Sequence, residues 1–369
     1  MVTSLSQQAT IAEVFIGQAW LQAKERAWGH FESRLRDIRR VIFCGCGDSH
    51  HAAYSLSCVV NNWCGLPAHG LSSMEAARYL VPHLTSNPRD LLLVGISASG
   101  ETARTLEAVA LARDSGLRTL GLTSSAQGTL SQEADWGLSL DLPEVSAGPG
   151  LLSYLASLLG GYALAASLAP ADLRKTIDRS VTQIPELLAS WQAIQSSQMD
   201  ELSAQWDLKL PLVFLGSGPA YGAAMFAAAK CIEATGQVAW AQGIEEWAHL
   251  EYFAEPAELP TWILSAGGAS SSREQEIAEA ASRIGRKLIV SEWKTGETLP
   301  AWIRESLAPL VLWAGPVIFA DRLMHRLGQT PFRSFSGGRG REEGGGISRI
   351  RSSARISSIA GLRAYRARN

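Results

Sequence analysis

The sequence predicts an α/β protein built from two tandem, doubly wound parallel sheets, with an N-terminal helix and an Arg/Gly-rich C-terminal tail. Short runs of apolar and β-branched residues each lead into a glycine- or serine-rich loop, and helical patterns lie between them. Strand, polar loop and helix in repeated order are typical of a doubly wound parallel sheet. The loops also recur, since Gly45 and Gly216 lie 171 residues apart and Ser97 and Ser265 lie 168 apart. Two loops that recur at nearly one offset indicate a tandem duplication.

The elements divide the chain into five predicted segments. Residues 1–38 carry apolar side chains at helical spacing and are expected to form an N-terminal helical segment. The first domain, 39–171, contains predicted strands at 40–44, 91–96 and 117–122. Residues 172–208 are expected to form a helical linker. The second domain, 209–330, contains predicted strands at 212–215, 261–264, 287–291 and 309–313.

The last predicted segment, 331–369, is a tail of unusual composition. Residues 332–369 hold nine arginines, two acidic residues and several glycines. Such a composition favours a flexible, solvated tail. The alternative is a segment that wraps around the body of the protein and donates arginines to an anionic ligand.

Composition limits the classes of partner. The 369-residue chain is 46% hydrophobic and 18% charged, whereas an average globular protein is about 25% charged. A chain with so little charge is expected to bury part of its surface against a partner, most simply a second copy of itself. The net charge of -2 argues against a generally basic nucleic-acid-binding protein.

The cysteine and hydropathy patterns indicate a soluble, cytoplasmic protein. Five unevenly spaced cysteines are typical of reduced thiols, and Cys44-x-Cys46 lacks the two-residue gap of a zinc or redox pair. No metal and no other cofactor is expected. Residues 145–171 lack charge over a length that could cross a bilayer, but their glycines and small side chains favour a buried helix. The first basic residue is Lys24, so no secretory signal is expected.

A run of hydroxyl residues follows the predicted strand at 91–96. Ser97, Ser99 and Thr102 surround Gly100, and a helix is expected to begin near Thr102. The first turn of a helix exposes N–H groups and the positive end of the helix dipole, and hydroxyl groups add neutral donors, which suits a phosphate. The structural alternative is plain N-capping, because serine and threonine are favoured at that position anyway.

These loops resemble those of a known family. Cys46-Gly-Asp-Ser49 and Ser97-Ala-Ser-Gly-Glu-Thr102 are similar to the two phosphate-binding loops of the sugar isomerase (SIS) domain, which is a flavodoxin-like fold. Over about 40–325 the tandem pair resembles the isomerase half of glucosamine-6-phosphate synthase, the fructosamine-phosphate deglycases and the aminosugar-phosphate isomerases. The resemblance implies that six residues hold the sugar phosphate: Ser49, Ser97, Ser99, Thr102, Gly47 and Gly100.

The second half carries a spacing that resembles the acid–base residues of this family. Lys230 and Glu233 stand three residues apart, and His249 follows sixteen residues after Glu233. The resemblance implies that Glu233 and Lys230 are catalytic and that His249 opens the sugar ring. A carboxylate can move a proton between C1 and C2 of an open-chain sugar when burial brings its pKa toward neutrality, and a histidine can exchange protons with ring oxygens at neutral pH. Without the resemblance, Lys230 and Glu233 would be a surface ion pair, and His249 an ordinary neighbour of Trp247 and Tyr252.

The chain departs from the family pattern at several positions. Ala98 replaces the glutamine that is usual between the two serines, and Ala147-Gly-Pro-Gly-Leu151 replaces a turn with hydroxyls and a lysine. No lysine follows Lys294, so the Schiff-base lysine near the end of the synthase has no counterpart. These departures favour a substrate other than plain fructose 6-phosphate. The second copy of the phosphate loop, 265–270, has lost the Gly-Glu-Thr sequence and is expected to bind no phosphate.

The predicted function is proton transfer at C1 and C2 of a sugar or aminosugar phosphate. The enzyme would be a ketosamine-phosphate deglycase or an aminosugar-phosphate isomerase or deaminase. The alternatives are a simple aldose–ketose isomerase of phosphosugars and a non-catalytic phosphosugar sensor. No glutaminase domain is recognised, so ammonia is not expected to come from glutamine. The resemblance also implies a homodimer with a shared active site, and neither a membrane nor a nucleic acid is expected as a partner.

Overall fold

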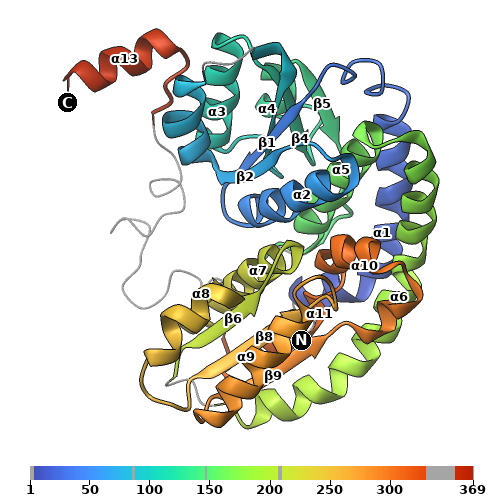
Figure 1. Cartoon of the computed structure of the whole chain (residues 1–369), viewed down its shortest axis with the longest axis vertical. Helices are drawn as coiled ribbons and strands as arrows, with labels where there is room; N and C mark the ends of the chain where they lie inside the picture. Colours follow the sequence, from blue (N-terminus) through green and yellow to red (C-terminus); the bar gives the residue numbers. More distant parts are fainter. Residues whose placement is uncertain (1–3, 85–87, 146–147, 207–209, 330–353, 369) are drawn as a thin grey trace. The chain divides into compact units, whose positions relative to one another are not determined.

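The computed structural model describes residues 4–84, 88–145, 148–206, 210–329 and 354–368 (Figure 1). The chain divides into two compact units, each made of several segments. The β1–β5 unit comprises Gln18–Pro143, Leu152–Ile177 and, of the C-terminal segment, the described residues 354–368. The β6–β9 unit comprises, of the described residues, 4–17, 144–145, 148–151, 178–206 and 210–329.

The β1–β5 unit contains one parallel sheet. Its strands are β1 (Arg40–Gly45), β2 (Ala68–Ser72), β3 (Leu91–Ile96), β4 (Arg118–Thr123) and β5 (Trp136–Ser139). They pair in the order β2-β1-β3-β4-β5, which is the strand order of flavodoxin-like sheets. Three of the strands were predicted. β2 and β5 were not predicted, because Ala-His-Gly-Leu-Ser and Trp-Gly-Leu-Ser contain no β-branched residue.

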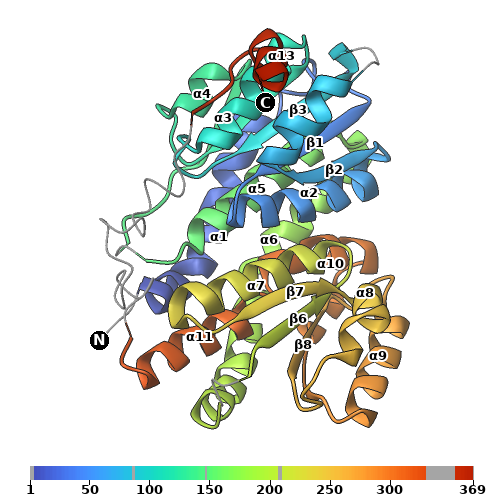
Figure 2. The ribbon, with the colours of Figure 1, turned by 90° about the vertical axis from the view of Figure 1, so that its left-hand side faces the viewer.

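Helices lie on both sides of this sheet (Figure 2). On one side, α3 (Ala103–Asp114) contacts the π-helical turn η1 (Glu75–Leu80) and α4 (Thr129–Glu133). On the other side, α2 (Asp48–Cys64) packs against α5 (Leu152–Leu168). Alternate residues of a strand point to opposite faces, and Leu91 and Leu93 of β3 join Val109 of α3 in one buried cluster. The last helix of the chain is α13 (Ile359–Arg368).

The uncharged stretch at 145–171 contains a buried helix, as predicted. Every residue of α5 except Ser153 and Leu168 is buried. A second apolar stretch, Ala301–Arg326, is long enough to cross a membrane, but 83% of its most apolar window is buried inside the protein. Both stretches therefore have the burial of core helices in a globular protein.

The β6–β9 unit contains a second parallel sheet. Its strands are β6 (Leu212–Gly216), β7 (Ala239–Gly243), β8 (Pro260–Ser265) and β9 (Lys287–Glu292), in the order β7-β6-β8-β9. Its helices are α7 (Pro219–Thr235), α8 (Ile244–His249), α9 (Ser271–Arg283), α10 (Ala301–Leu307) and α11 (Ala314–Arg326).

The described chain also forms short 3-10 turns: η2 (Val81–His83), η3 (Pro88–Asp90), η4 (Glu251–Phe253), η5 (Lys294–Thr298) and η6 (Ala308–Leu310).

The predicted strand at 309–313 is wrong. Its residues form η6 and the turn that leads into α11, and Leu310 through Trp313 are completely buried. A short, continuous apolar run fits a buried strand and a buried helical segment equally well, so periodicity does not separate the two. The strand β7, which the sequence analysis missed, lies instead at the edge of the sheet beside β6.

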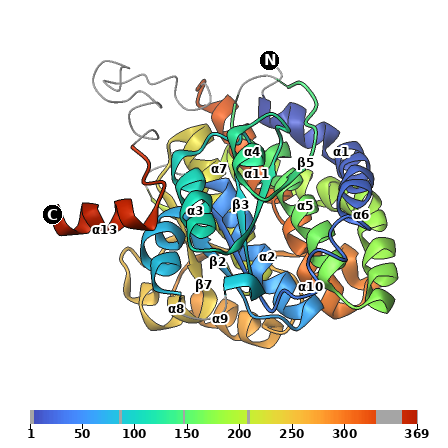
Figure 3. The ribbon, with the colours of Figure 1, turned by 90° about the horizontal axis from the view of Figure 1, so that it is seen from above.

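Two long helices match the predicted N-terminal and linker helices. These are α1 (Ser4–Ala27) and α6 (Ala171–Ala204), which lie side by side (Figure 3). Gln192 Nε2 of α6 donates a hydrogen bond of 3.0 Å to the Ala9 carbonyl of α1. Each helix is divided between the two compact units, so neither unit is one continuous piece of chain. The predicted domain boundaries stay predictions.

Candidate functional site

The candidate phosphate site lies where the strand order of the β1–β5 sheet reverses. β2, which follows β1 in the chain, pairs with one edge of β1, and β3 pairs with the opposite edge of β1. Cys44 at the end of β1 is in register with Gly95 near the end of β3, so the loops that follow these strands emerge next to each other. Open α/β sheets bind their ligands in this crevice, outside the carboxyl ends of the strands.

The first loop depends on two glycines. A Cβ on Gly45 would lie 2.5 Å from the carbonyl carbon of Ser49, so glycine alone allows α2 to begin this close to β1. Gly47 precedes the first residue of α2 with φ 55° and ψ -129°, a conformation that side chains disfavour. A Cβ on Gly47 would meet no atom of the described residues within 4 Å. The backbone of this loop therefore borders open space, with Ser49 in the first turn of α2.

The second loop keeps its hydroxyl groups close together. Thr102 precedes α3 but makes no side-chain capping bond in the described chain. Its hydroxyl lies instead 2.9 Å from the hydroxyl of Ser97. Ser99 Oγ accepts a hydrogen bond of 3.2 Å from the Glu101 N–H, and Gly100 has a φ of +75°. Plain N-capping, the structural alternative, does not describe the bonds that these three hydroxyls make.

A third loop holds the second loop in place. The Thr129 N–H and hydroxyl both donate to the Glu101 carboxylate, at 2.7 Å each, and these bonds lower the pKa of Glu101. The Thr123 hydroxyl donates to the Ala98 carbonyl at 3.1 Å. The sequence signal for this support was present, because 123–125 is a hydroxyl-rich loop directly after a strand.

The structure brings His50 and Glu75, two residues for which no role was predicted, to the same edge of the sheet. His50 follows Ser49, and Glu75 follows β2. Burial lowers the pKa of His50, His51 lowers it further, and the charge of Glu75 opposes both effects. Because burial dominates, His50 is suited to act as a neutral hydrogen-bonding group beside the first loop rather than as a cation.

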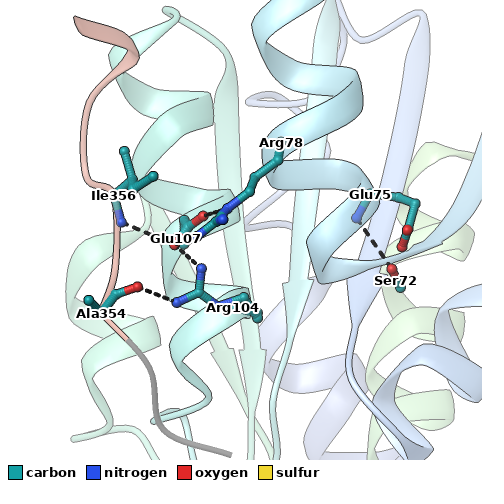
Figure 4. A network of polar contacts seen from close by, with 7 residues as sticks. All are labelled: Ser72, Glu75, Arg78, Arg104, Glu107, Ala354 and Ile356. Carbon is teal, nitrogen blue, oxygen red and sulfur yellow. Dashed lines mark hydrogen bonds and ion pairs between the residues drawn. The ribbon is translucent and has the colours of Figure 1, made fainter. Parts of the chain in front are cut away.

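A buried carboxylate joins α3 to the C-terminal segment (Figure 4). The side chain of Glu107 is completely buried and accepts a hydrogen bond of 2.7 Å from Arg78 Nε. Arg104, two residues after Thr102, forms an ion pair with the same carboxylate and donates to the Ala354 carbonyl at 2.6 Å. The Ile356 N–H donates to Glu107 Oε2 at 3.0 Å. Since losing one partner of a buried ion pair costs about 3–5 kcal/mol, Glu107 is the principal polar anchor of this contact.

The described end of the tail packs on the β1–β5 unit through a few apolar side chains. Leu362 is 2% exposed and belongs to the core cluster of the β1–β5 unit, and Ile356 and Ile359 pack against that cluster. These apolar residues attach the segment to the β1–β5 unit, while most of its other described side chains are exposed to solvent, so the solvated tail stays a prediction. Arg355 pairs with the Glu133 carboxylate at 3.2 Å. Most of the tail, 330–353, lies outside the described residues, and for that part both predictions stay open.

In the β6–β9 unit, Lys230 and Glu233 form a tight pair on α7. Lys230 Nζ lies 2.5 Å from Glu233 Oε2 and 4.9 Å from the centre of the Phe226 ring. The Lys230 side chain is completely buried, whereas that of Glu233 is 27% exposed. An ordinary surface ion pair, the alternative interpretation, does not fit a buried lysine. The pair holds the carboxylate at the surface while its cationic partner lies beneath it.

His249 lies at the end of α8 and pairs with a different carboxylate. Its Nε2 lies 3.2 Å from Glu245 Oε1, and its side chain is 72% exposed. Arg273 Nε also binds Glu245, at 2.7 Å, and lowers the pKa of that carboxylate. Glu233 and His249 thus belong to separate ion pairs. Trp247, the aromatic neighbour considered above, is a core residue of the unit.

The turn at 147–151, where the chain differs from the family pattern, is hydrogen-bonded to the N-terminal helix α1. Gln8 of α1 donates to the Pro149 carbonyl at 2.9 Å and accepts from the Leu151 N–H at 2.8 Å. Ala147, the first residue of that turn, lies outside the described residues. The described turn is thus fixed by one glutamine side chain.

A known domain family matches the part of the chain that contains both loops. Residues 34–167, which include both glycine loops, match the model described as "SIS domain". Residues 34–167 are a SIS domain. Over 202 residues the chain is 27% identical to a glutamine–fructose-6-phosphate aminotransferase (isomerizing) of Aquifex aeolicus, and the match covers 54% of this chain and 33% of that protein. The chain therefore spans about a third of the length of the curated relatives it matches.

Two solved structures share the fold over most of the chain. The C-terminal domain of glucosamine-fructose-6-phosphate aminotransferase from Francisella tularensis aligns with a TM-score of 0.76 at 15% identity, covering 90% of this chain and 98% of that one. Glucosamine-6-phosphate deaminase from Thermotoga maritima aligns with a TM-score of 0.64 at 18% identity, covering 88% and 95%. At these identities the likeness is one of fold. The α/β architecture with two parallel sheets is thus confirmed.

Cys46 provides a chemical probe of the SIS-domain loops. Burial raises the pKa of Cys44, Cys64 and Cys231 to about 12, so these thiols stay protonated and unreactive. Cys46 is exposed between Gly45 and Gly47. We expect a thiol reagent at mildly alkaline pH to modify Cys46 first and a sugar 6-phosphate to slow this reaction, as mapped by mass spectrometry.

The unphosphorylated sugar is the control for this labelling and should give no protection. Modification of Cys46 at the same rate with and without the sugar phosphate would contradict a ligand site at these loops.

Proposed function

We propose that this protein binds a phosphorylated sugar or aminosugar and catalyses proton transfer between C1 and C2. The observation that carries the proposal is the pair of loops at the strand-order reversal, where the hydroxyls of Ser97 and Thr102 are held 2.9 Å apart at the start of α3. The reaction would be release of an amine from a ketosamine phosphate, or isomerisation or deamination of an aminosugar phosphate. All of these share the same proton transfer.

The phosphate would be bound by neutral donors. Two helices, α2 and α3, begin at the loops after β1 and β3, and each offers backbone N–H groups and the positive end of its dipole. Ser49, Ser97, Ser99 and Thr102 add hydroxyls, and Gly47 and Gly100 allow the backbone to approach the ligand closely. A phosphate carries roughly -1.5 to -2 charges at neutral pH, so hydrogen bonds to it are charge-assisted and strong.

Glu233 would carry the proton. Its carboxylate is accessible, and the buried Lys230 ammonium fixes its position through the 2.5 Å contact. His249 would protonate the ring oxygen during ring opening, because it is exposed and its ring orientation is set by Glu245. In these roles Glu233 and His249 are the acid–base residues, and Lys230 positions the first of them.

The substrate is proposed to contain nitrogen. The relative from Aquifex aeolicus is named an aminotransferase and the structural neighbour from Thermotoga maritima a glucosamine-6-phosphate deaminase. By the family resemblance, Ala98 stands in place of a glutamine and changes one group beside the phosphate loop. A substrate related to an aminosugar phosphate, but different from that of the aminotransferases, agrees with both facts.

We also infer that the two halves are copies of one doubly wound unit. The order β7-β6-β8-β9 repeats the order β2-β1-β3-β4. Gly47 and Gly218, which precede α2 and α7, share nearly the same dihedral angles: φ 55° and ψ -129°, against φ 51° and ψ -134°. A soluble, cytoplasmic protein is proposed from the small number and uneven spacing of the cysteines and from the buried apolar helices.

The active form is proposed to be a homodimer. Large apolar side chains are exposed close to His249 in the chain: Leu250 at 66%, Phe253 at 69% and Tyr252 at 38%. Exposed apolar groups gathered around a polar residue are typical of an interaction surface. A second copy of the chain is the simplest partner, and His249 would then reach the active site of the neighbouring subunit.

The first prediction concerns the phosphate. Ser99→Ala or Thr102→Val should weaken binding of a sugar 6-phosphate by about 1–3 kcal/mol, because each removes one hydrogen bond to a charged group. Isothermal titration calorimetry measures this loss. The control is Ser115→Ala at the other end of α3, whose hydroxyl bonds only to the helix backbone in the described chain and whose loss should not alter affinity. Equal affinity of the unmodified protein for phosphorylated and unphosphorylated sugar would refute the phosphate site.

The second prediction concerns the base. Glu233→Gln keeps an oxygen that can accept from Lys230 but removes the carboxylate, so proton exchange at C1 and C2 should fall by at least ~10²-fold. NMR in deuterated water with a panel of sugar and aminosugar 6-phosphates measures the exchange and identifies the substrate. Glu246→Gln, an exposed carboxylate on α8, is the matched control. Near-normal exchange in Glu233→Gln would assign Glu233 a structural role.

The third prediction concerns the dimer. Glu233→Gln and His249→Ala chains should each be inactive, and a mixture that has exchanged subunits should recover activity. Random pairing leaves about a quarter of the sites with both groups intact, so about a quarter of the original turnover is the upper bound. Native mass spectrometry confirms that exchange has occurred. Exchange without recovery would mean that the two residues act within one chain or that one of them is not catalytic.

A further inference from the structure

The β6–β9 sheet contains a second crevice with the same backbone shape as the phosphate site. β6 lies beside β8 and β7 on its other side, so the strand order also reverses here. A Cβ on Gly216 would lie 2.6 Å from the Ala220 carbonyl oxygen, as a Cβ on Gly45 would from that of Ser49. The dihedral angles of Gly218 match those of Gly47. By its backbone, this crevice could receive an anion as the first one could.

A carboxylate of the chain itself lies in this crevice. Glu305 of α10 accepts a hydrogen bond of 3.2 Å from the Ala269 N–H in the loop after β8. A Cβ on Gly268 would lie only 2.2 Å from the carboxyl carbon of Glu305, and one on Gly218 would lie 3.8 Å from its Oε1. Glu305 therefore lies against the second loop and within reach of the first. Over Gly47, by contrast, the described residues leave open space.

The hydroxyls of the second loop also bind a carboxylate. Ser265 and Ser270 correspond, at an offset of 168, to Ser97 and Thr102. Both donate to the buried carboxylate of Glu274, with 2.6 Å between Ser270 Oγ and Glu274 Oε1. In the first site the corresponding hydroxyls bond to each other. The donors of the second crevice thus already have anionic partners.

We propose that the second crevice has the backbone of a phosphate site but is permanently occupied by the Glu305 side chain. Each chain then binds its phosphorylated ligand at the first site alone. This inference rests on the proposed phosphate role of the Ser97 loop. Glu305 takes the position over the glycine loops and its charge, together with that of Glu274, repels a phosphate dianion. The same contact fastens α10 to the edge of the sheet, so the former ligand crevice becomes a structural joint.

The test counts phosphate ions bound per chain. Inorganic phosphate is titrated by calorimetry and ³¹P NMR into the whole chain, which should bind a single phosphate, and Thr102→Val should weaken that binding. In the Thr102→Val background, the further changes Glu274→Gln and Glu305→Ala should restore binding, now at the second crevice. Glu297→Ala, an acidic residue of the preceding turn η5, is the matched control and should restore nothing.

The outcomes separate this inference from the proposed function. Unchanged affinity for phosphate in Thr102→Val, in the otherwise unmodified chain, would refute the first phosphate site. Two phosphates bound by the unchanged chain, or no restored binding in a folded Glu274→Gln/Glu305→Ala variant, would overturn the occupied crevice. If that variant does not fold, Glu305→Ala alone is tested in the same background, and the absence of any gain there also overturns the proposal.

Discussion

The parallel pairing of β1 with β3 is the constraint on which the candidate site depends. Because the two strands run in the same direction in close register, both loops and both following helices emerge at one edge of the sheet. The reversal of strand order at this point leaves a crevice between the loops rather than a covered surface. Any substitution that shifts one strand against the other would separate Gly47 from Ser97 and dismantle the site.

The small and hydroxyl residues of the loops after β1 and β3 determine which kind of ligand this crevice suits. Glycines at 45, 47 and 100 allow backbone N–H groups to line the crevice, and serines and threonines supply short, neutral donors. Lysine is not needed, since the helix termini provide positive potential without a mobile charged side chain. The loop is then stiffened from outside by Glu101 and Thr129, so the donors are ordered before a ligand arrives.

The two sheets differ in the groups that their buried or half-buried carboxylates bind. In the β1–β5 unit, Glu107 binds Arg78, Arg104 and the C-terminal segment. In the β6–β9 unit, Glu305 and Glu274 bind the loop donors directly. One backbone design is thus proposed to form a ligand site in one half and a structural contact in the other. The difference is made by a few acidic side chains, because a buried or half-buried anion satisfies the same N–H and O–H groups as a phosphate.

The sequence by itself determined the α/β class, the glycine and hydroxyl loops, the register of Lys230 with Glu233, and the buried helix at 145–171. These follow from local patterns, since loop glycines, helix starts and helical spacing are short-range features. The edge strands β2 and β7, the non-strand at 309–313, the packing of residues 354–368 and the partners of Glu107 and Glu305 were decided by tertiary structure. Edge pairing and burial depend on which distant segments meet, as when Glu305 meets Ala269 across 36 residues of chain. No local sequence pattern predicts such a contact, because the free-energy cost of burying a carboxylate depends on the hydrogen-bond donors that folding places around it.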